Sequence, residues 1–250
     1  MYRGSRKHVL DWTSRKSFLA ELKETLAPLP IRTTSATIFM PRGYEAPMEA
    51  RLESFGPRWM PSSETWEILK NWWLEYPAGA NTPNWDIAIG CQIEERPGLV
   101  LVEAKANWPE LSLSGKALDA MASPNSQRNH ERIGKAISEA CEGWRRMDPR
   151  VSLTRDSHYQ LANRLAFTWK LATLGYPVVL LYLGFIGDEG IRDVGAPFFD
   201  NHDWERAFRQ YIEGTIPIDL LDCRVEFGSS PVWLVSRSRA IIENSSSLDP

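Results

Sequence analysis

Cysteine and histidine are scarce in this chain, which has three cysteines and four histidines among its 250 residues. Cys91, Cys141 and Cys223 lie far apart, and their number is odd. This pattern argues against a disulfide framework and favours the reducing environment of the cytoplasm. No spacing of cysteine and histidine matches that of a zinc site, so we expect no structural zinc.

Long hydrophobic runs and a strong excess of one charge are also missing. The longest apolar run, near residues 178–186, is shorter than the roughly 20 residues of a membrane-spanning helix. The basic N-terminus has no apolar segment of the signal-peptide type. The formal net charge of −3 excludes a polycation that coats nucleic acid, so any nucleic-acid site has to be a local patch.

The patterns that are present predict an α/β protein with a mixed β-sheet flanked by helices on both faces, in a single domain over residues 1–250. The strand at 178–185 is apolar on both faces and therefore belongs in a covered sheet. Hydrophobic spacing, caps and turn residues predict helices at 14–27, 47–54, 63–76, 126–147, 157–174 and 203–213. They predict strands at 36–40, 85–94, 99–106, 178–185, 223–227 and 232–236.

Charged residues stand at one end of the predicted hairpin of strands 85–94 and 99–106. Glu103 and Lys105 follow a run of four aliphatic residues, and their spacing of two places them on one face. Pro97-Gly98 suggests a turn centred between Glu95 and Arg96, which sets Asp86 opposite Lys105 on that same face. Two close carboxylates repel unless a proton or cation lies between them, and hard oxygen ligands suit Mg²⁺ or Mn²⁺.

Asp86 and the later Glu103-Ala104-Lys105, on a hairpin between two helices, resemble the PD-(D/E)XK nuclease superfamily. The similarity covers about residues 63–185, with an N-terminal segment 1–62 and a C-terminal extension 186–250 outside this restriction-endonuclease-like core. The segment 159–166, YQLANRLA, looks like the second helix of a bacterial family of that type. Trp85 stands where the superfamily often has proline before the aspartate.

The resemblance implies a metal site and a mechanism. Asp86, Glu103 and the backbone carbonyl of Ala104 would bind Mg²⁺ or Mn²⁺, which polarises the phosphodiester. Lys105 would orient or help to deprotonate the attacking water. The superfamily often adds a glutamate from the first helix, for which Glu64 is the preferred candidate here. The alternative for Glu64 is an acid that complements the helix dipole.

The helix predicted at 157–174 carries three polar residues, Gln160, Asn163 and Arg164, on one face. They either form a polar wall over the metal site or lie at a solvent boundary. In the first interpretation Gln160 joins the catalytic residues, and Asn163 and Arg164 bind substrate. The corresponding alternative for Glu103 and Lys105 is a solvated ion pair at a strand end.

These observations favour a cytoplasmic, Mg²⁺-dependent nuclease that acts on nucleic acid, DNA rather than RNA, with no membrane partner. A homodimer is left open. The alternative function is a nuclease-fold module that binds nucleic acid or acts as a scaffold without turnover.

Overall fold

The computed structural model describes residues 2–52 and 63–242. The helices are α1 (Gly4–Thr13), α2 (Phe18–Thr25), α4 (Ser63–Trp73), α5 (Pro124–Arg145), α6 (Tyr159–Thr173) and α7 (Asn201–Ile212). Short 3-10 turns are η1 (Gly43–Glu45), η2 (Trp108–Glu110), η3 (Glu189–Ile191) and η4 (Ile218–Leu220). The strands are β1 (Ile31–Arg32), β2 (Ile38–Met40), β3 (Ala50–Arg51), β4 (Asn84–Trp85), β5 (Ile87–Ile93), β6 (Arg96–Lys105), β7 (Val178–Ile186), β8 (Arg224–Phe227) and β9 (Ser230–Ala240).

A mixed sheet forms the centre of the described structure. Its strands run in the order β1-β5-β6-β7-β9-β8, and β2 also pairs with β5. The β5–β6 and β8–β9 pairs are antiparallel, whereas β6–β7 and β7–β9 are parallel. Parallel neighbours need a crossover connection, and the chain between β6 and β7 supplies it through α5 and α6. The expected mixed α/β class is therefore confirmed.

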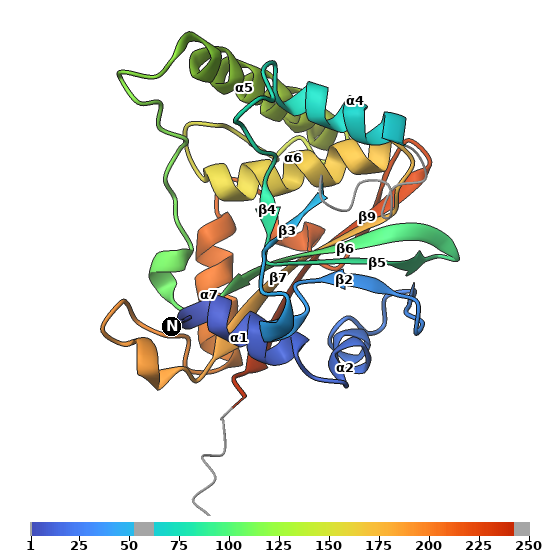
Figure 1. Ribbon diagram of the computed structural model, residues 1–250, viewed down its shortest axis with the longest axis vertical. Coiled ribbons are helices and arrows are strands. Elements are labelled where there is room, and N and C mark those ends of the chain that lie inside the picture. The colour runs from blue at the N-terminus through green and yellow to red at the C-terminus, as the bar shows by residue number, and fades with distance from the viewer. Residues whose placement is uncertain (1, 53–62, 243–250) are drawn as a thin grey trace, which may run out of the picture.

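Alternating residues of the central strands build two separate cores. Leu99 and Leu101 of β6 pack into the core that includes α4, α5, α6 and α7. Val100 and Val102 pack into the core that includes α1 and α2. Figure 1 shows α4, α5 and α6 above the sheet and α1 and α2 below it. Because successive residues of a strand point to opposite faces, polar residues at odd positions of β6 must face the α6 side.

The hairpin turn differs from the predicted one. Ile93 pairs with Arg96, so the turn consists of Glu94 and Glu95, with φ angles of 49° and 61°. Two residues with positive φ form the tight turn that suits the twist of a hairpin, although glycine or asparagine is usual there. Gly98 lies within β6, where an added Cβ would approach the Pro177 carbonyl oxygen to 2.7 Å. Glycine is needed at this position for packing and not for the turn.

The N-terminal third also departs from the sequence expectations. α1 was not predicted, and the helix expected at 14–27 is confined to Phe18–Thr25. The helix expected at 47–54 is wrong at Ala50–Arg51, which form strand β3 paired with β4, and residues 53–54 lie outside the described residues. The pairing of β3 with β4 explains the difference, because tertiary contacts override local helix propensity. Across residues 2–52 and 63–242, no helix is both long and apolar enough to cross a membrane.

Candidate active site

The carboxyl end of β6 carries a buried ion pair on the α6 side of the sheet. Lys105 Nζ donates to Glu103 Oε1 at 2.7 Å. Glu103 is 2% exposed and Lys105 is 5% exposed, so this pair is not the solvated strand-end pair of the alternative interpretation. Buried charges are costly unless they are paired and hydrogen-bonded, and both partners have further contacts.

The N-terminal half of α6 supplies those contacts. Gln160 Oε1 accepts a hydrogen bond from Lys105 Nζ at 2.8 Å, and Arg164 Nε donates to Glu103 Oε2 at 2.7 Å. The Arg164 guanidinium lies 4.5 Å from the centre of the Trp85 ring. It also donates to Asn163 Oδ1 at 2.8 Å. The polar face of α6 therefore points at the strand end and not into solvent.

The same helix is fixed in place by the chain that follows β6. The backbone N–H groups of His158 and Tyr159 donate to the carbonyl groups of Leu113 and Ser114 at 2.9 and 3.0 Å. Gly115 lies so close to this contact that an added Cβ would approach the Asp156 carbonyl oxygen to 2.3 Å. These backbone contacts set the start of α6 beside the end of β6.

Asp86 lies at the bend between β4 and β5, partly exposed to the cleft. Its Oδ2 atom accepts a hydrogen bond from the Ala104 N–H at 2.8 Å. The ladder pairs Ile87 with Val102, so its continuation places Asp86 beside Glu103 and not opposite Lys105. The predicted register was wrong by two positions. An even shift keeps side chains on the same face, which is why Asp86 still meets Glu103.

The two carboxyl groups have opposite electrostatic surroundings. Burial and the Glu103 carboxylate raise the pKa of Asp86 to about 7. Burial acts on the pKa of Glu103 in the same sense, but the Arg164 and Lys105 cations outweigh it and leave that pKa below its usual value. The two cations therefore outweigh burial at Glu103, whereas at Asp86 burial and the neighbouring carboxylate outweigh the same two cations.

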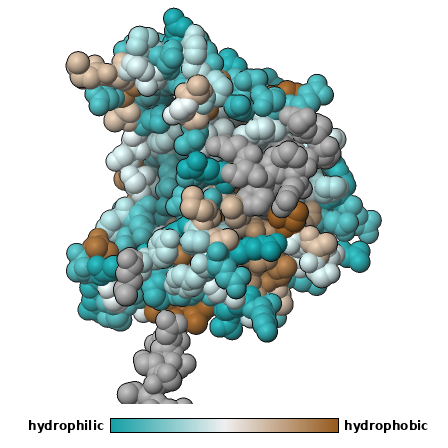
Figure 2. All heavy atoms as spheres, in the orientation of Figure 1, coloured by the Kyte–Doolittle hydropathy of each residue, from teal (hydrophilic) through white to brown (hydrophobic). Residues whose placement is uncertain are grey.

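These residues open on a cleft made of two adjoining cavities. We call Asp86, Glu103, Lys105, Gln160 and Arg164 the cleft cluster. One cavity measures about 440 Å³ and the other about 540 Å³, and both are lined by Asp86, Glu103, Tyr159 and Gln160. Figure 2 shows this face of the molecule hollowed between its upper and lower parts, with mostly hydrophilic side chains in the hollow.

The cleft offers two carboxylates to a hard divalent cation, although both oxygens of Glu103 already accept hydrogen bonds from Lys105 and Arg164. Mg²⁺ commonly uses one or two carboxylates and completes its octahedron with water and substrate oxygens. Asp86 and Glu103 are two such carboxylates, and the raised pKa of Asp86 marks a place where added positive charge is favoured. No group of three or more acidic, histidine or cysteine ligands within residues 2–52 and 63–242 could hold a metal. A cation here would therefore depend on this pair, on backbone oxygen and on water.

The candidate for an additional glutamate, Glu64, does not lie at the cleft. Glu64 is exposed at the start of α4 and lines neither cavity of the cleft. Glu49, just before β3, lines the 440 Å³ cavity, and its Oε2 atom accepts a hydrogen bond from Asn84 Nδ2 at 3.0 Å. Sequence reasoning missed Glu49 because the segment around it was assigned to a helix.

Lys116 and Glu110 are two further cleft residues that were not foreseen. Lys116 Nζ lies 4.9 Å from the centre of the Tyr159 ring, and burial lowers the pKa of this lysine. Glu110 lines the 540 Å³ cavity and accepts a hydrogen bond from the Ala106 N–H at 2.8 Å. Both residues follow the segment Glu103–Lys105 within a short distance along the chain. That proximity was the only signal available from the sequence.

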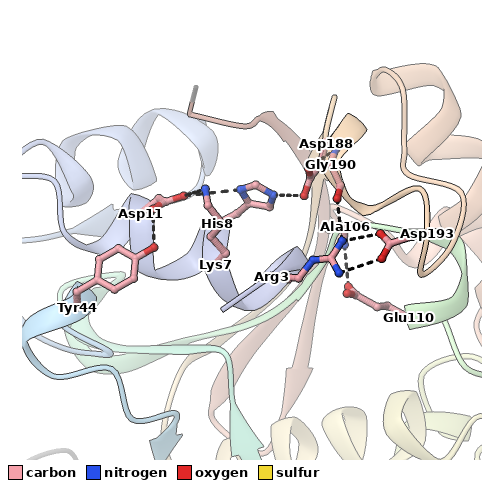
Figure 3. Close-up of polar contacts among 10 residues, drawn as sticks. All are labelled: Arg3, Lys7, His8, Asp11, Tyr44, Ala106, Glu110, Asp188, Gly190 and Asp193. Carbon is pink, nitrogen blue, oxygen red and sulfur yellow. Dashed lines mark hydrogen bonds and ion pairs between the residues drawn. The ribbon is translucent and has the colours of Figure 1, made fainter. Parts of the chain in front are cut away.

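A second polar cluster lies on the other face of the sheet, between α1 and the loop after β7 (Figure 3). We call Lys7, His8, Asp11 and Asp188 the clamp cluster. His8 Nε2 lies 2.5 Å from Asp188 Oδ2, and His8 Nδ1 lies 3.9 Å from Asp11 Oδ2. Lys7 Nζ donates to Asp11 at 2.7 Å. None of these four residues lines either cavity of the cleft.

Comparison with known proteins identifies no relative of this chain. No protein-family model matches the chain, and neither the curated proteins nor the solved structures searched contain a significant match.

Proposed function

We propose that the protein is a metal-dependent nuclease of the PD-(D/E)XK type that hydrolyses phosphodiester bonds in nucleic acid, with Mg²⁺ or Mn²⁺ as cofactor. The observation that supports it most is the convergence in one cleft of Asp86, from the bend before β5, with Glu103 and Lys105 of β6. The resemblance of the sequence to that superfamily rests on these same residues. DNA is the favoured substrate class.

Each residue of the cleft would have its own role in such a reaction. Asp86 and Glu103 would hold the divalent cation, which would supply Lewis-acid polarisation of the phosphodiester. Lys105 has three N–H donors, of which two are used by Glu103 and Gln160. The third donor is available to a water molecule or a phosphoryl oxygen in the cleft. Gln160 holds the ammonium group in place, because its carbonyl oxygen accepts from Lys105.

Arg164 gives this site a particular constraint. It occupies the second carboxylate oxygen of Glu103, while Lys105 occupies the first. A cation that binds Glu103 must therefore share each oxygen with an existing donor. This observation favours the second candidate function, a nuclease-fold module that binds nucleic acid without cleaving it. In that case the cations neutralise Glu103 permanently.

A cleavage assay separates the two functions. Purified protein is incubated with single- and double-stranded DNA and RNA in Mg²⁺, in Mn²⁺ and in EDTA. We expect cleavage that needs a divalent cation. Replacing Lys105 by methionine, which removes the ammonium group but keeps an unbranched side chain one atom shorter, should lower the rate by about a hundredfold. Lys23→Met on α2 is the matched control, because Lys23 is exposed on the other side of the sheet.

Metal binding is measured separately by calorimetry with Mg²⁺ and Mn²⁺. Asp86→Asn should weaken it, whereas Lys105→Met should not. Absence of cleavage on every substrate with both metals, together with equal nucleic-acid affinity of wild type and Asp86→Asn, would select the binding module.

A further inference from the structure

The two cavities of the cleft are lined by different lysines. Lys105 lines only the 540 Å³ cavity, and Lys116 lines only the 440 Å³ cavity. Asp86 and Glu103 line both cavities, so the proposed cation site is common to them. Lys105 already has a role in the proposed reaction, whereas Lys116 does not.

Two contacts hold Lys116 in position. Its backbone N–H donates to the Arg155 carbonyl oxygen at 2.8 Å, and its Nζ atom lies 4.9 Å from the centre of the Tyr159 ring, which lines the same cavity. The Lys116 side chain is partly exposed. Its Nζ atom has no hydrogen-bond partner among the described residues, yet it is not one of their buried atoms without a partner. The ammonium group therefore keeps contact with solvent, and a ligand can reach it.

The charge of Lys116 has no carboxylate partner among the described residues. The acidic residues Glu49, Asp86 and Glu103 line the same cavity, but none of them forms an ion pair with Lys116. Glu103 is already paired with two other cations. Burial lowers the pKa of Lys116, which shows that its charge is not compensated. A partly desolvated ammonium group of this kind is stabilised by a bound anion.

A second cation lies beside Lys116. Arg155 Nη1 donates to the His130 carbonyl oxygen at 3.2 Å, and His130 belongs to α5. The pKa of His130 is lowered by burial and then by the charges of Arg155 and Lys116. The acids Asp156 and Glu131 act in the opposite sense without reversing this effect. The surroundings of Lys116 therefore favour negative charge.

We propose, on the basis of the nuclease function above, that Lys116 binds the phosphate group next to the one that is cleaved. The scissile phosphodiester contacts Lys105 in one cavity, and the strand that continues into the other cavity brings its neighbouring phosphate to Lys116. Lysine suits this role because its ammonium group binds phosphate as a compact charge. The substrate class is therefore a polynucleotide, in which a second phosphate contributes to binding, and not an isolated phosphodiester.

The experiment compares wild type with Lys116→Met, Lys116→Arg and Lys135→Met on a labelled DNA strand, alone and in a duplex. Lys135→Met is the matched control, because Lys135 is exposed on α5 and lines neither cavity of the cleft. Binding is followed by fluorescence anisotropy in Ca²⁺ over a series of KCl concentrations. Cleavage in Mg²⁺ is followed at each bond, also on strands that carry one neutral methylphosphonate in place of a phosphate. Thermal unfolding verifies that each variant is folded.

We expect Lys116→Met to weaken binding by about tenfold. The slope of log affinity against log salt concentration should become shallower by about 0.7 to 0.9, the contribution of one phosphate contact. Lys116→Arg, which keeps the charge, should restore most of both. A methylphosphonate on one side of the cut bond should slow cleavage by wild type by about tenfold and cause no further loss in Lys116→Met.

The possible outcomes separate this inference from the nuclease function. If Lys116→Met is indistinguishable from Lys135→Met in affinity, salt slope and response to the methylphosphonate, the inference is overturned, and cleavage by both variants would leave the nuclease function standing. A salt slope that depends on Lys116, without any cleavage, would retain the phosphate site and overturn the nuclease function alone. Absence of binding to either DNA would overturn both.

Discussion

The cleft cluster and the clamp cluster both lie at the carboxyl ends of parallel strands, on opposite faces of one sheet. In the cleft cluster, Glu103 and Lys105 of β6 are buried but face two cavities. In the clamp cluster, His8 and Asp188 are buried against each other between α1 and the end of β7. The aromatic ring of Phe185 packs 5.3 Å from the His8 ring.

The clusters differ in where their unsatisfied group lies. His8 Nδ1 of the clamp cluster is buried without a hydrogen-bond partner among the described residues and lies away from both cavities, whereas Asp86 of the cleft cluster lines both. Asp86 in the cleft cluster has a raised pKa because burial and Glu103 oppose its charge. In the clamp cluster, Asp11 accepts from both Lys7 and Tyr44, at 2.7 Å each, and Asp188 contacts His8 and the Gly190 N–H. A perturbed carboxyl group beside a cavity is typical of a functional site, whereas a cluster that lines no cavity is more typical of a structural one. We infer chemistry from the first cluster and attachment of α1 from the second.

The largest effect is expected for Glu103→Gln, which breaks the cleft cluster at its centre. Lys105 and Arg164 would lose their shared carboxylate and remain buried as unpaired charges. We expect the free energy of unfolding to fall by about 3 kcal/mol and the cleavage rate by about a hundredfold or more. Urea unfolding and the cleavage assay measure the two quantities. Exposed Glu131→Gln on α5 is the control, and cleavage at the wild-type rate by Glu103→Gln would remove Glu103 from the site.

The second largest effect is expected in the pH dependence of the free energy of unfolding, through the titration of Asp86. The pKa of Asp86 is about 7 in the folded protein against an ordinary value of 3.8. The folded state therefore binds this proton more tightly than the unfolded state, and the resulting stabilisation is complete at low pH. It is lost as the pH rises from about 4 through 7, where Asp86 must ionise.

Asp86→Asn does not have this titration. In EDTA, the stability of Asp86→Asn relative to wild type should rise between about pH 4 and 7 and level off above. Unfolding in urea across this range measures the difference, and Asp119→Asn in the exposed loop before α5 is the control. A difference that does not change with pH would show that Asp86 is ionised throughout.

The sequence predicted which side chains meet at the end of β6 better than it predicted the strand pairing that brings them together. Pro97-Gly98 is a strong turn signal, yet the chain turns at Glu94-Glu95, which carry no such signal. The cause is tertiary: Gly98 is required where β6 passes the Pro177 carbonyl group. The error amounted to two positions, so the period of two along a strand preserved the face shared by Asp86, Glu103 and Lys105.

Other parts of the cleft could not be predicted from local patterns. The hydrogen bonds of Gln160 and Arg164 to the end of β6 depend on where α6 packs. The spacing of these residues along the helix left two positions open for their polar face, over the site or at a solvent boundary. Glu49 reaches the cleft only because β3 pairs with β4. The clamp cluster joins residues 180 positions apart, and neither His8 nor Asp188 belongs to a recognisable motif.

For the clamp cluster, His8→Ala should lower stability and leave chemistry intact. The substitution leaves the Asp188 carboxylate without its imidazole partner, so we expect a loss of about 2 kcal/mol in the free energy of unfolding. The cleavage rate of the folded protein should remain within about twofold of wild type, since His8 lines neither cavity. Asp193→Asn is the control, because the exposed Arg3–Asp193 pair contributes little. A large loss of cleavage in folded His8→Ala would join the two clusters into one functional unit.

The smallest effect is expected from the two candidates for an additional carboxylate. Glu49 lines the cavity that contains Asp86 and Glu103, whereas Glu64 lies on the exposed start of α4. Removing one charge near a bound divalent cation, without removing a direct ligand, weakens binding modestly in a solvated cleft. Glu49→Gln should therefore raise the Mg²⁺ concentration needed for half-maximal cleavage by about fivefold, and Glu64→Gln should leave it unchanged. The Mg²⁺ dependence of cleavage at constant ionic strength measures both, and the reverse order would restore the first-helix glutamate that the sequence resemblance suggested.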